Sequence, residues 1–108
     1  MSRESIGEFE QLILLAILRL EERAYGVTIL DEVRSCTGRS VLRPAVYVAL
    51  RRLEGKGLVR SREEAGDSRR GGRPRRYYAV EPSGLSQLRD ARQALLSMWE
   101  GLQGVLGG

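Results

Sequence analysis

The sequence predicts a mainly helical α+β fold, in which three helices and a two-stranded β-hairpin precede a long C-terminal helix. Three observations carry this prediction. Apolar residues recur at helical spacing in the first half, two strand-like segments flank a glycine- and arginine-rich loop, and an apolar seam runs along the last quarter. A chain of 108 residues accommodates one such domain, which we expect over residues 1–80, with the C-terminal helix over residues 81–108.

The first two helices are predicted from apolar faces with i, i+3, i+4 spacing. The second helix is expected from about Gly26 to about Cys36. The first helix ends near Leu20 and carries a second apolar stripe at Leu14, Leu15 and Leu18, so it must be buried on more than one side, and another subunit can provide the second contact. Its main face comprises Phe9, Leu12, Ile13, Ala16, Ile17 and Leu20.

A third helix is predicted from Pro44 to Lys56, because proline suits a helix start and Gly57 suits a stop. Its inward face is apolar, whereas its outward face is basic and aromatic, which is typical of a helix that reads DNA bases. The alternative is an ordinary amphipathic helix with solvated arginines. The inward residues are Val46, Ala49, Leu50 and Leu53, and the outward residues are Arg43, Tyr47, Val48 and Arg51.

Two strands, over residues 58–64 and 75–80, are predicted to form a hairpin around the loop of residues 65–74. Basic loops are common on protein surfaces, but this one directly follows a basic helix. We therefore expect a wing whose arginines reach phosphates or enter the minor groove of DNA. These arginines are Arg69, Arg70, Arg73 and Arg75.

Charge and composition narrow the function classes. Residues 39–76 hold twelve basic and four acidic residues, a net charge of +8, against −4 in the remainder, which indicates a polyanionic partner. The chain has no histidine, a single cysteine and no phosphate-binding glycine loop, so we expect neither an enzyme nor a metal or cofactor site. The longest apolar run is too short for a membrane span, and no signal peptide begins the chain, so a cytoplasmic location is expected.

The last helix is predicted to form a dimer interface. Its seam has the alternating spacing of three and four residues that joins helices of two subunits, at Leu88, Ala91, Leu95, Met98 and Leu102, continued by Val105. Glycines at 101 and 104 predict fraying beyond Glu100.

Trp99 beside the seam suggests a slot for a planar aromatic effector, although a lone tryptophan more commonly just packs. The slot residues would be Trp99, Met98, Leu95, Phe9 and Leu15.

With these elements in this order, the chain resembles the PadR family of transcriptional regulators. The matching stretches are residues 7–20, 24–26, 46–59 and 72–80, together with Gly84. The resemblance implies a homodimeric winged helix-turn-helix repressor, with its third helix in the major groove of double-stranded DNA and, commonly, a small aromatic or amphipathic effector. Its DNA contacts carry over to Tyr47, Arg51 and Arg52, and to the wing residues 72–75.

One departure from the family pattern concerns the start of the third helix. The family usually has Ser-Pro-Gly-Thr where this chain has Leu42-Arg43-Pro44-Ala45, so base preference cannot be copied from relatives. The competing hypothesis is a winged-helix dimer that binds a protein or a hydrophobic ligand without specific DNA binding. The +8 segment argues against it, because charged residues are depleted at the centre of protein interfaces.

Overall fold

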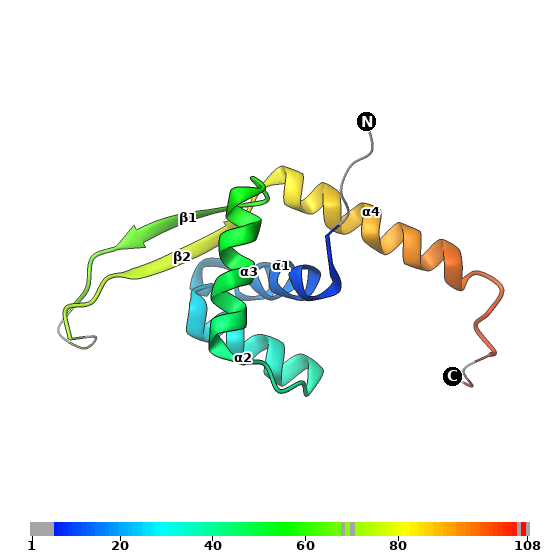
Figure 1. The fold of residues 1–108 in the computed structure, drawn as a ribbon, viewed down its shortest axis with the longest axis horizontal. Coiled ribbons are helices and arrows are strands. Elements are labelled where there is room, and N and C mark those ends of the chain that lie inside the picture. Colours follow the sequence, from blue (N-terminus) through cyan, green and yellow to red (C-terminus); the bar gives the residue numbers. More distant parts are fainter. Residues whose placement is uncertain (1–5, 68, 70, 106, 108) are drawn as a thin grey trace.

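The computed structural model describes residues 6–67, 69, 71–105 and 107, and it confirms the predicted mainly helical α+β fold (Figure 1). Three helices, an antiparallel hairpin and a long last helix follow one another along the chain. The bounds are α1 Glu8–Leu20, α2 Gly26–Thr37, α3 Arg43–Gly55, β1 Val59–Glu64, β2 Arg75–Val80 and α4 Pro82–Trp99, with a 3₁₀ turn over Glu21–Arg23 between α1 and α2.

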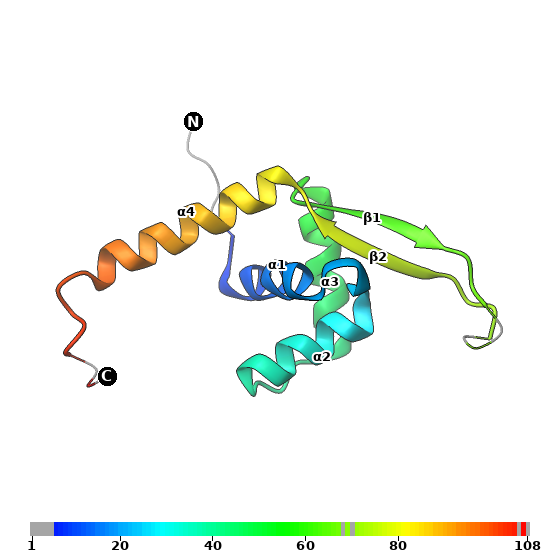
Figure 2. The ribbon, with the colours of Figure 1, turned by 180° about the vertical axis from the view of Figure 1, so that it is seen from behind.

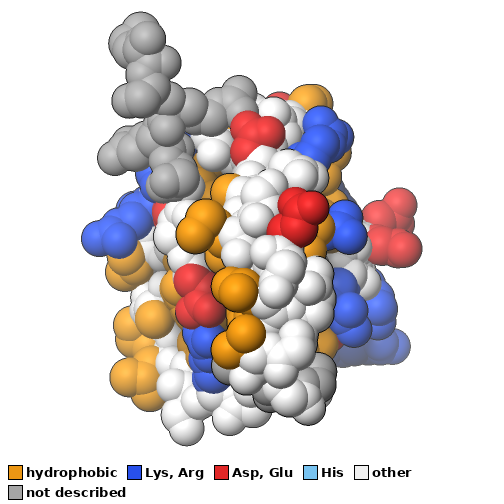
Figure 3. All heavy atoms as spheres, turned by 90° about the vertical axis from the view of Figure 1, so that its right-hand side faces the viewer, with side chains coloured by type: hydrophobic (Ala, Val, Ile, Leu, Met, Phe, Trp, Pro, Cys, Tyr) orange, Lys and Arg blue, Asp and Glu red, His pale blue; other side chains and the backbone are white. Residues whose placement is uncertain are grey.

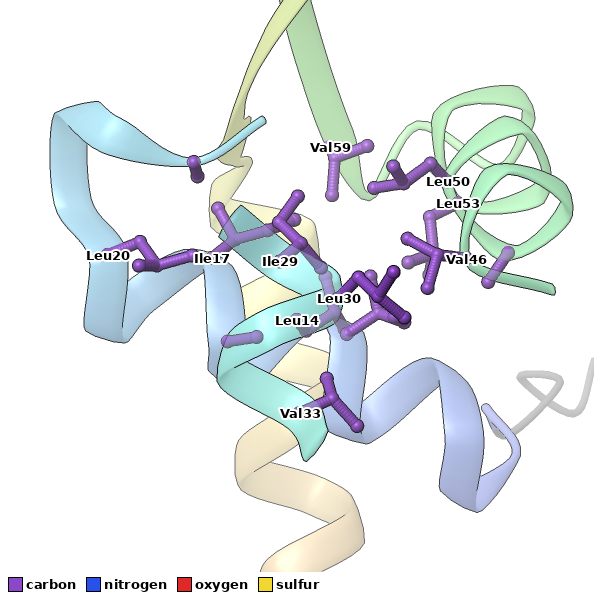
Figure 4. Packing of buried hydrophobic residues seen from close by; sticks show 14 of the residues in the cluster. Leu14, Ile17, Leu20, Ile29, Leu30, Val33, Val46, Leu50, Leu53 and Val59 are labelled. Atoms are coloured by element: carbon purple, nitrogen blue, oxygen red, sulfur yellow. The ribbon is translucent and has the colours of Figure 1, made fainter. Parts of the chain in front are cut away.

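The hydrophobic core lies between the first three helices (Figure 4). Side chains of α1, α2 and α3 point toward one another, and Val59 of β1 lies beside Leu50. Each large apolar side chain removed from water contributes about 1.5–3 kcal/mol, so this packing decides which side of α3 faces out. The predicted inward face of α3 is confirmed, because all four of its residues are buried: Val46, Ala49, Leu50 and Leu53.

The second apolar stripe of α1 divides between the core and the surface. Leu14 is fully buried within the chain, so this member of the second stripe needs no second subunit to cover it. The reason is that α1 packs against α2, α3 and β2 together, and its buried arc is therefore wider than one helical stripe. Leu15 and Leu18, the other two residues of the second stripe, are exposed in the single chain.

The turn between α2 and α3 is fixed by one arginine. Gly38 ends α2 in the left-handed region, with φ of 70°, a conformation that glycine adopts without steric cost. Arg34 then donates two hydrogen bonds to the carbonyl oxygen of Val41, from Nε at 3.0 Å and from Nη2 at 2.7 Å. Held in this way, the chain starts α3 at Arg43, one residue before the predicted start.

The hairpin is regular and projects away from the helices (Figure 1). Its register pairs Val59 with Val80 at the base and Glu64 with Arg75 toward the loop. The base is also tied to the α1–α2 connection, because the Tyr78 amide donates to the Ala24 carbonyl at 2.8 Å and Tyr25 forms a β-bridge with Tyr77. The direction of the wing is therefore set by the helical domain.

Helix α4 leaves the domain on the side opposite the hairpin (Figure 1). Its first turn packs so closely that a Cβ at Gly84 would lie 2.7 Å from Val80 Cγ1, and Leu88 packs against the core. The helix ends at Trp99, so Leu102 lies in the turns that follow and the predicted seam is not helical at that position. None of the described helices is both long and apolar enough to cross a membrane.

Candidate nucleic-acid interface

The outer side of α3 is an exposed helical surface rich in basic residues. The helix lies on one side of the molecule, in front of α1 in Figure 1 and behind it in Figure 2. Because four residues on its other side are buried, its remaining side chains project outward. The outward placement is confirmed for the four predicted residues, because Arg43, Tyr47, Val48 and Arg51 are all exposed. Arg52, a DNA contact that the family resemblance implies, is exposed as well.

Tyr47 is positioned by the first residue of α2. A Cβ on Gly26 would overlap the phenol of Tyr47, with the ring carbon Cζ only 2.6 Å away, so the ring lies directly over the glycine backbone. The start of α2 is itself fixed by Thr28, whose Oγ1 accepts from the Tyr25 amide at 3.0 Å and donates to the Arg23 carbonyl at 2.6 Å. The direction of Tyr47 thus depends on a glycine 21 positions earlier.

Two tyrosines and two arginines join the wing to the helical domain. The Tyr25 and Tyr77 rings meet edge to face, with centroids 5.5 Å apart. The Arg75 guanidinium lies 3.9 Å from the Tyr25 ring centroid, and that of Arg62 lies 4.9 Å from the Tyr77 centroid. Arg75 Nη1 also donates to Tyr77 Oη at 3.4 Å, a contact that raises the pKa of Arg75. Arg75 therefore positions the wing and stays fully charged.

A hollow of about 610 Å³ lies between the wing and the start of α2, with Tyr47 at its edge. Burial raises the pKa of Tyr78 on its wall, so this phenol stays neutral at physiological pH. Four arginines line the hollow, so its wall offers charged donors of the kind that bind phosphate groups. The lining residues are Tyr25, Gly26, Val27, Tyr47, Arg69, Arg73, Pro74, Arg75, Arg76 and Tyr78.

The basic residues of the chain differ in whether an acidic side chain neutralises them. The hairpin arginines Arg60, Arg62 and Arg76 form ion pairs with Glu81, Glu64 and Glu63 at 2.8, 2.8 and 3.2 Å. In the part of the chain that the structure describes, no ion pair involves the α3 arginines at 43, 51 and 52. Helix α3 therefore presents three exposed arginines whose charge no acidic side chain of the described residues neutralises.

The match to known proteins agrees with this arrangement. A model of the family described as "Transcriptional regulator PadR-like family" matches residues 14–90 of this chain. The chain belongs to the PadR-like family. Since that family consists of transcriptional regulators, the chain is a DNA-binding regulator with a winged-helix fold, as predicted, and not an enzyme.

Solved structures of PadR-like regulators share the fold over nearly the whole chain. A PadR family regulator from Eggerthella lenta is 28% identical, with 93% of this chain and 87% of that chain covered and a TM-score of 0.69. A PadR-like regulator from Bacillus cereus is 25% identical, with 93% and 92% covered and a TM-score of 0.72. No curated protein matches the chain significantly in sequence.

The structure brings part of the predicted PadR-like site together. Tyr47, Arg69, Arg73 and Arg75 line one hollow, whereas Arg70 lies outside the described residues. Sequence reasoning missed the part that the start of α2 plays in the site. Gly26 was noted as a helix start and Tyr25 only as part of a family stretch. A tyrosine and a glycine directly before an apolar helical face could have suggested a close helix contact. Arg76 and Tyr78 were also missed as lining residues.

The residues predicted for the aromatic slot do not meet within one chain. Leu15 lines a hollow of about 320 Å³ between α1 and α2, whereas Phe9 lines another beside α3. Trp99, Met98 and Leu95 line neither of these hollows, and all three are exposed on the second half of α4. Figure 3, seen from that end of the molecule, shows exposed hydrophobic side chains between charged ones. A slot would therefore need a second subunit.

No cluster of metal-ligating residues occurs among the described residues.

We predict that Gly26→Ala and Tyr47→Ala weaken DNA binding through the same contact. The added methyl group displaces the Tyr47 ring, at a cost of about 0.5–1.5 kcal/mol if one contact is lost, and the double variant should lose no more than Tyr47→Ala alone. Affinities for a fragment selected from a random DNA library measure this. Gly55→Ala is the control, because a Cβ there meets nothing within 4 Å. If the losses of binding free energy of the two single variants added up in the double variant, Gly26 would not act through Tyr47.

Proposed function

We propose that this PadR-like chain is a homodimeric repressor, which binds a roughly palindromic operator with one α3 in the major groove of each half-site. The observation that carries the proposal is the uncompensated charge of Arg43, Arg51 and Arg52 on the exposed side of α3, next to the arginine-lined hollow under the wing. Such a surface raises the local concentration of a polyanion, and phosphate contacts then position the helix against the bases.

The residues take different roles in this proposal. Tyr47 and Arg51 face the base edges, while Arg43 and Arg52 lie at the edges of the groove. On the wing, Arg69, Arg70 and Arg73 contact phosphates or the minor groove. Arg75 stands between wing and helices, where its stacking on Tyr25 gives it a positioning role as well as a charge for DNA. Half-sites about 34–36 Å apart match two such helices in a two-fold dimer.

Exposed apolar residues support the dimer. Leu95 is 57% exposed and Met98 is 76% exposed in a single chain. In a monomer, both apolar side chains would remain in contact with water, which is unfavourable in free energy. Leu15 and Leu18 are also exposed, beside the hollow between α1 and α2. We propose that residues 1–80 form the DNA-binding domain and that residues 81–108 hold two copies together, with Leu88, Ala91, Leu95, Met98 and Leu102 at the interface.

In such a dimer, an aromatic effector slot would form between the two copies of Trp99. The indole offers a flat apolar surface, and Met98 and Leu95 offer adaptable walls, with Phe9 and Leu15 closing the slot from α1. Occupancy would respace the two α3 helices and lower operator affinity if the respaced state binds the effector better. The competing function, a winged-helix dimer that binds proteins without DNA specificity, leaves the uncompensated arginines of α3 unexplained.

The first prediction separates base readout from charge. Arg51→Ala should lose about 1–3 kcal/mol and relax preference at one operator position. Arg73→Ala should weaken binding to all sequences and flatten the slope of log affinity against log salt by about one. Arg60→Ala is the matched control, because it removes the same charge where Glu81 already neutralises it, 2.8 Å away. Titrations of selected and random duplexes at several salt concentrations measure this.

Two outcomes would contradict this assignment. If Arg51→Ala and the wild-type chain bound the selected site with equal affinity, Arg51 would have no part in readout. A wild-type chain with the same affinity for the selected and the random duplex would favour the competing function.

The second prediction concerns assembly. Light scattering at micromolar concentration should give the wild-type chain the mass of two copies, 24.2 kDa from a 12.1 kDa chain. Leu95→Glu should shift it to the monomer, because a charge would be buried at the interface. Leu42→Glu is the control, at an equally apolar and more exposed side chain directly before α3, outside the proposed interface. A monomeric wild-type chain would exclude the proposed dimer.

The third prediction concerns the effector. Planar aromatic compounds should quench the fluorescence of Trp99, the only tryptophan, saturably at micromolar concentration. Operator binding should weaken over the same concentration range, since one site couples both effects. Quenching that never saturates, or that saturates without a change in DNA affinity, would leave Trp99 as a packing residue.

A further inference from the structure

The outward side of α3 has two chemically different halves. Pro44, Val48 and Arg51 follow one another at spacings of four and three residues, so they form one ridge opposite the buried face of the helix. The first half of this ridge is apolar and the second half is cationic. Val48, in the middle, is 42% exposed.

Helix α3 has few types of side chain that can form hydrogen bonds with bases. It contains no Asn, Gln, Ser or Thr, so it lacks the amide that pairs with the donor and acceptor of adenine. Its exposed donors are three arginines and Tyr47, and a bidentate arginine contact selects guanine. Its one acidic side chain, Glu54, accepts from Ser61 Oγ at 2.6 Å. An A·T pair can still be distinguished in the major groove through the C5-methyl group of thymine, which an apolar side chain contacts.

Val48 is suited to such a contact. It lines an open hollow of about 450 Å³ together with Pro44, Ala45 and Phe9. The one carboxylate on the rim, Glu10, is paired with Lys56 at 3.0 Å, which reduces its repulsion of phosphates. A β-branched residue is only an average helix former, so neither helix propensity nor core packing accounts for valine at this exposed position.

We propose that Val48 recognises a thymine through its C5-methyl group, and that each operator half-site has this thymine within one or two base pairs of the guanine read by Arg51. The spacing follows from the helix, since three residues rise about 4.5 Å along its axis, close to the 3.4 Å step between base pairs. The inference rests on the proposed function, because it requires α3 in the major groove.

The test replaces thymine by uracil, which removes the methyl group and nothing else. Each thymine of the selected operator is replaced in turn, symmetrically in both half-sites, and affinity is measured for the wild-type chain, for Val48→Ala and for Leu42→Ala. Leu42 is the matched control, because it is another exposed apolar residue, 70% exposed, directly before the same helix. Thermal unfolding of each variant confirms that it is folded.

The wild-type chain should bind about threefold to tenfold more weakly per methyl group when uracil stands at one particular position, as expected for one lost apolar contact. Val48→Ala should lose most of this difference, because its shorter side chain makes less contact with the methyl group, whereas Leu42→Ala should keep the difference. The inference is overturned if no uracil position weakens wild-type binding to its selected operator, or if Val48→Ala keeps the full difference. Failure of the wild-type chain to prefer any sequence would instead overturn the proposed function, and this inference with it.

Discussion

The arrangement of the site depends on one short connection, Ala24 to Gly26, where α1, α2, α3 and the wing meet. The Ala24 carbonyl accepts a hydrogen bond from β2, the Tyr25 ring packs against Tyr77 and Arg75, and Gly26 leaves room for Tyr47. Three consecutive residues thus fix the positions of the wing and α3 relative to each other. This matters because a DNA-binding regulator loses less free energy on binding when its wing and its helix already have one preorganised geometry.

Charge in this molecule is divided between structure and recognition. Ion pairs with glutamates neutralise Arg60, Arg62 and Arg76 of the strands and add little stability at the surface. They also reduce the repulsion between arginines within the hairpin. The arginines of α3 have no such acidic partner in the described chain. The net charge of +8 in the middle of the sequence is therefore not spread evenly over this surface. Part of it is neutralised on the strands, whereas the arginines of α3 remain available to a polyanion.

Apolar surface is divided in a similar way. Helix α1 buries most of its circumference inside the chain, and what remains exposed on it, Leu15 and Leu18, is small beside the exposed apolar residues of α4. Only the first part of α4 is tied to the domain, through Gly84 and Leu88. The leucines, Met98 and Trp99 of its second half are exposed to solvent, which is why most contacts of the proposed dimer lie there.

The sequence by itself determined the elements and the inward face of α3, because helical periodicity and glycine or proline signals are local properties. It also determined the family, through stretches that span most of the chain. It also indicated that the last helix ends near Glu100, because the glycines at 101 and 104 are a local signal. Only the tertiary structure decided that Leu14 is core. The same holds for Arg75 stacking on Tyr25 and for Gly26 lying beneath Tyr47. These features depend on which segments lie side by side in space, and periodicity along one helix carries no information about its neighbours.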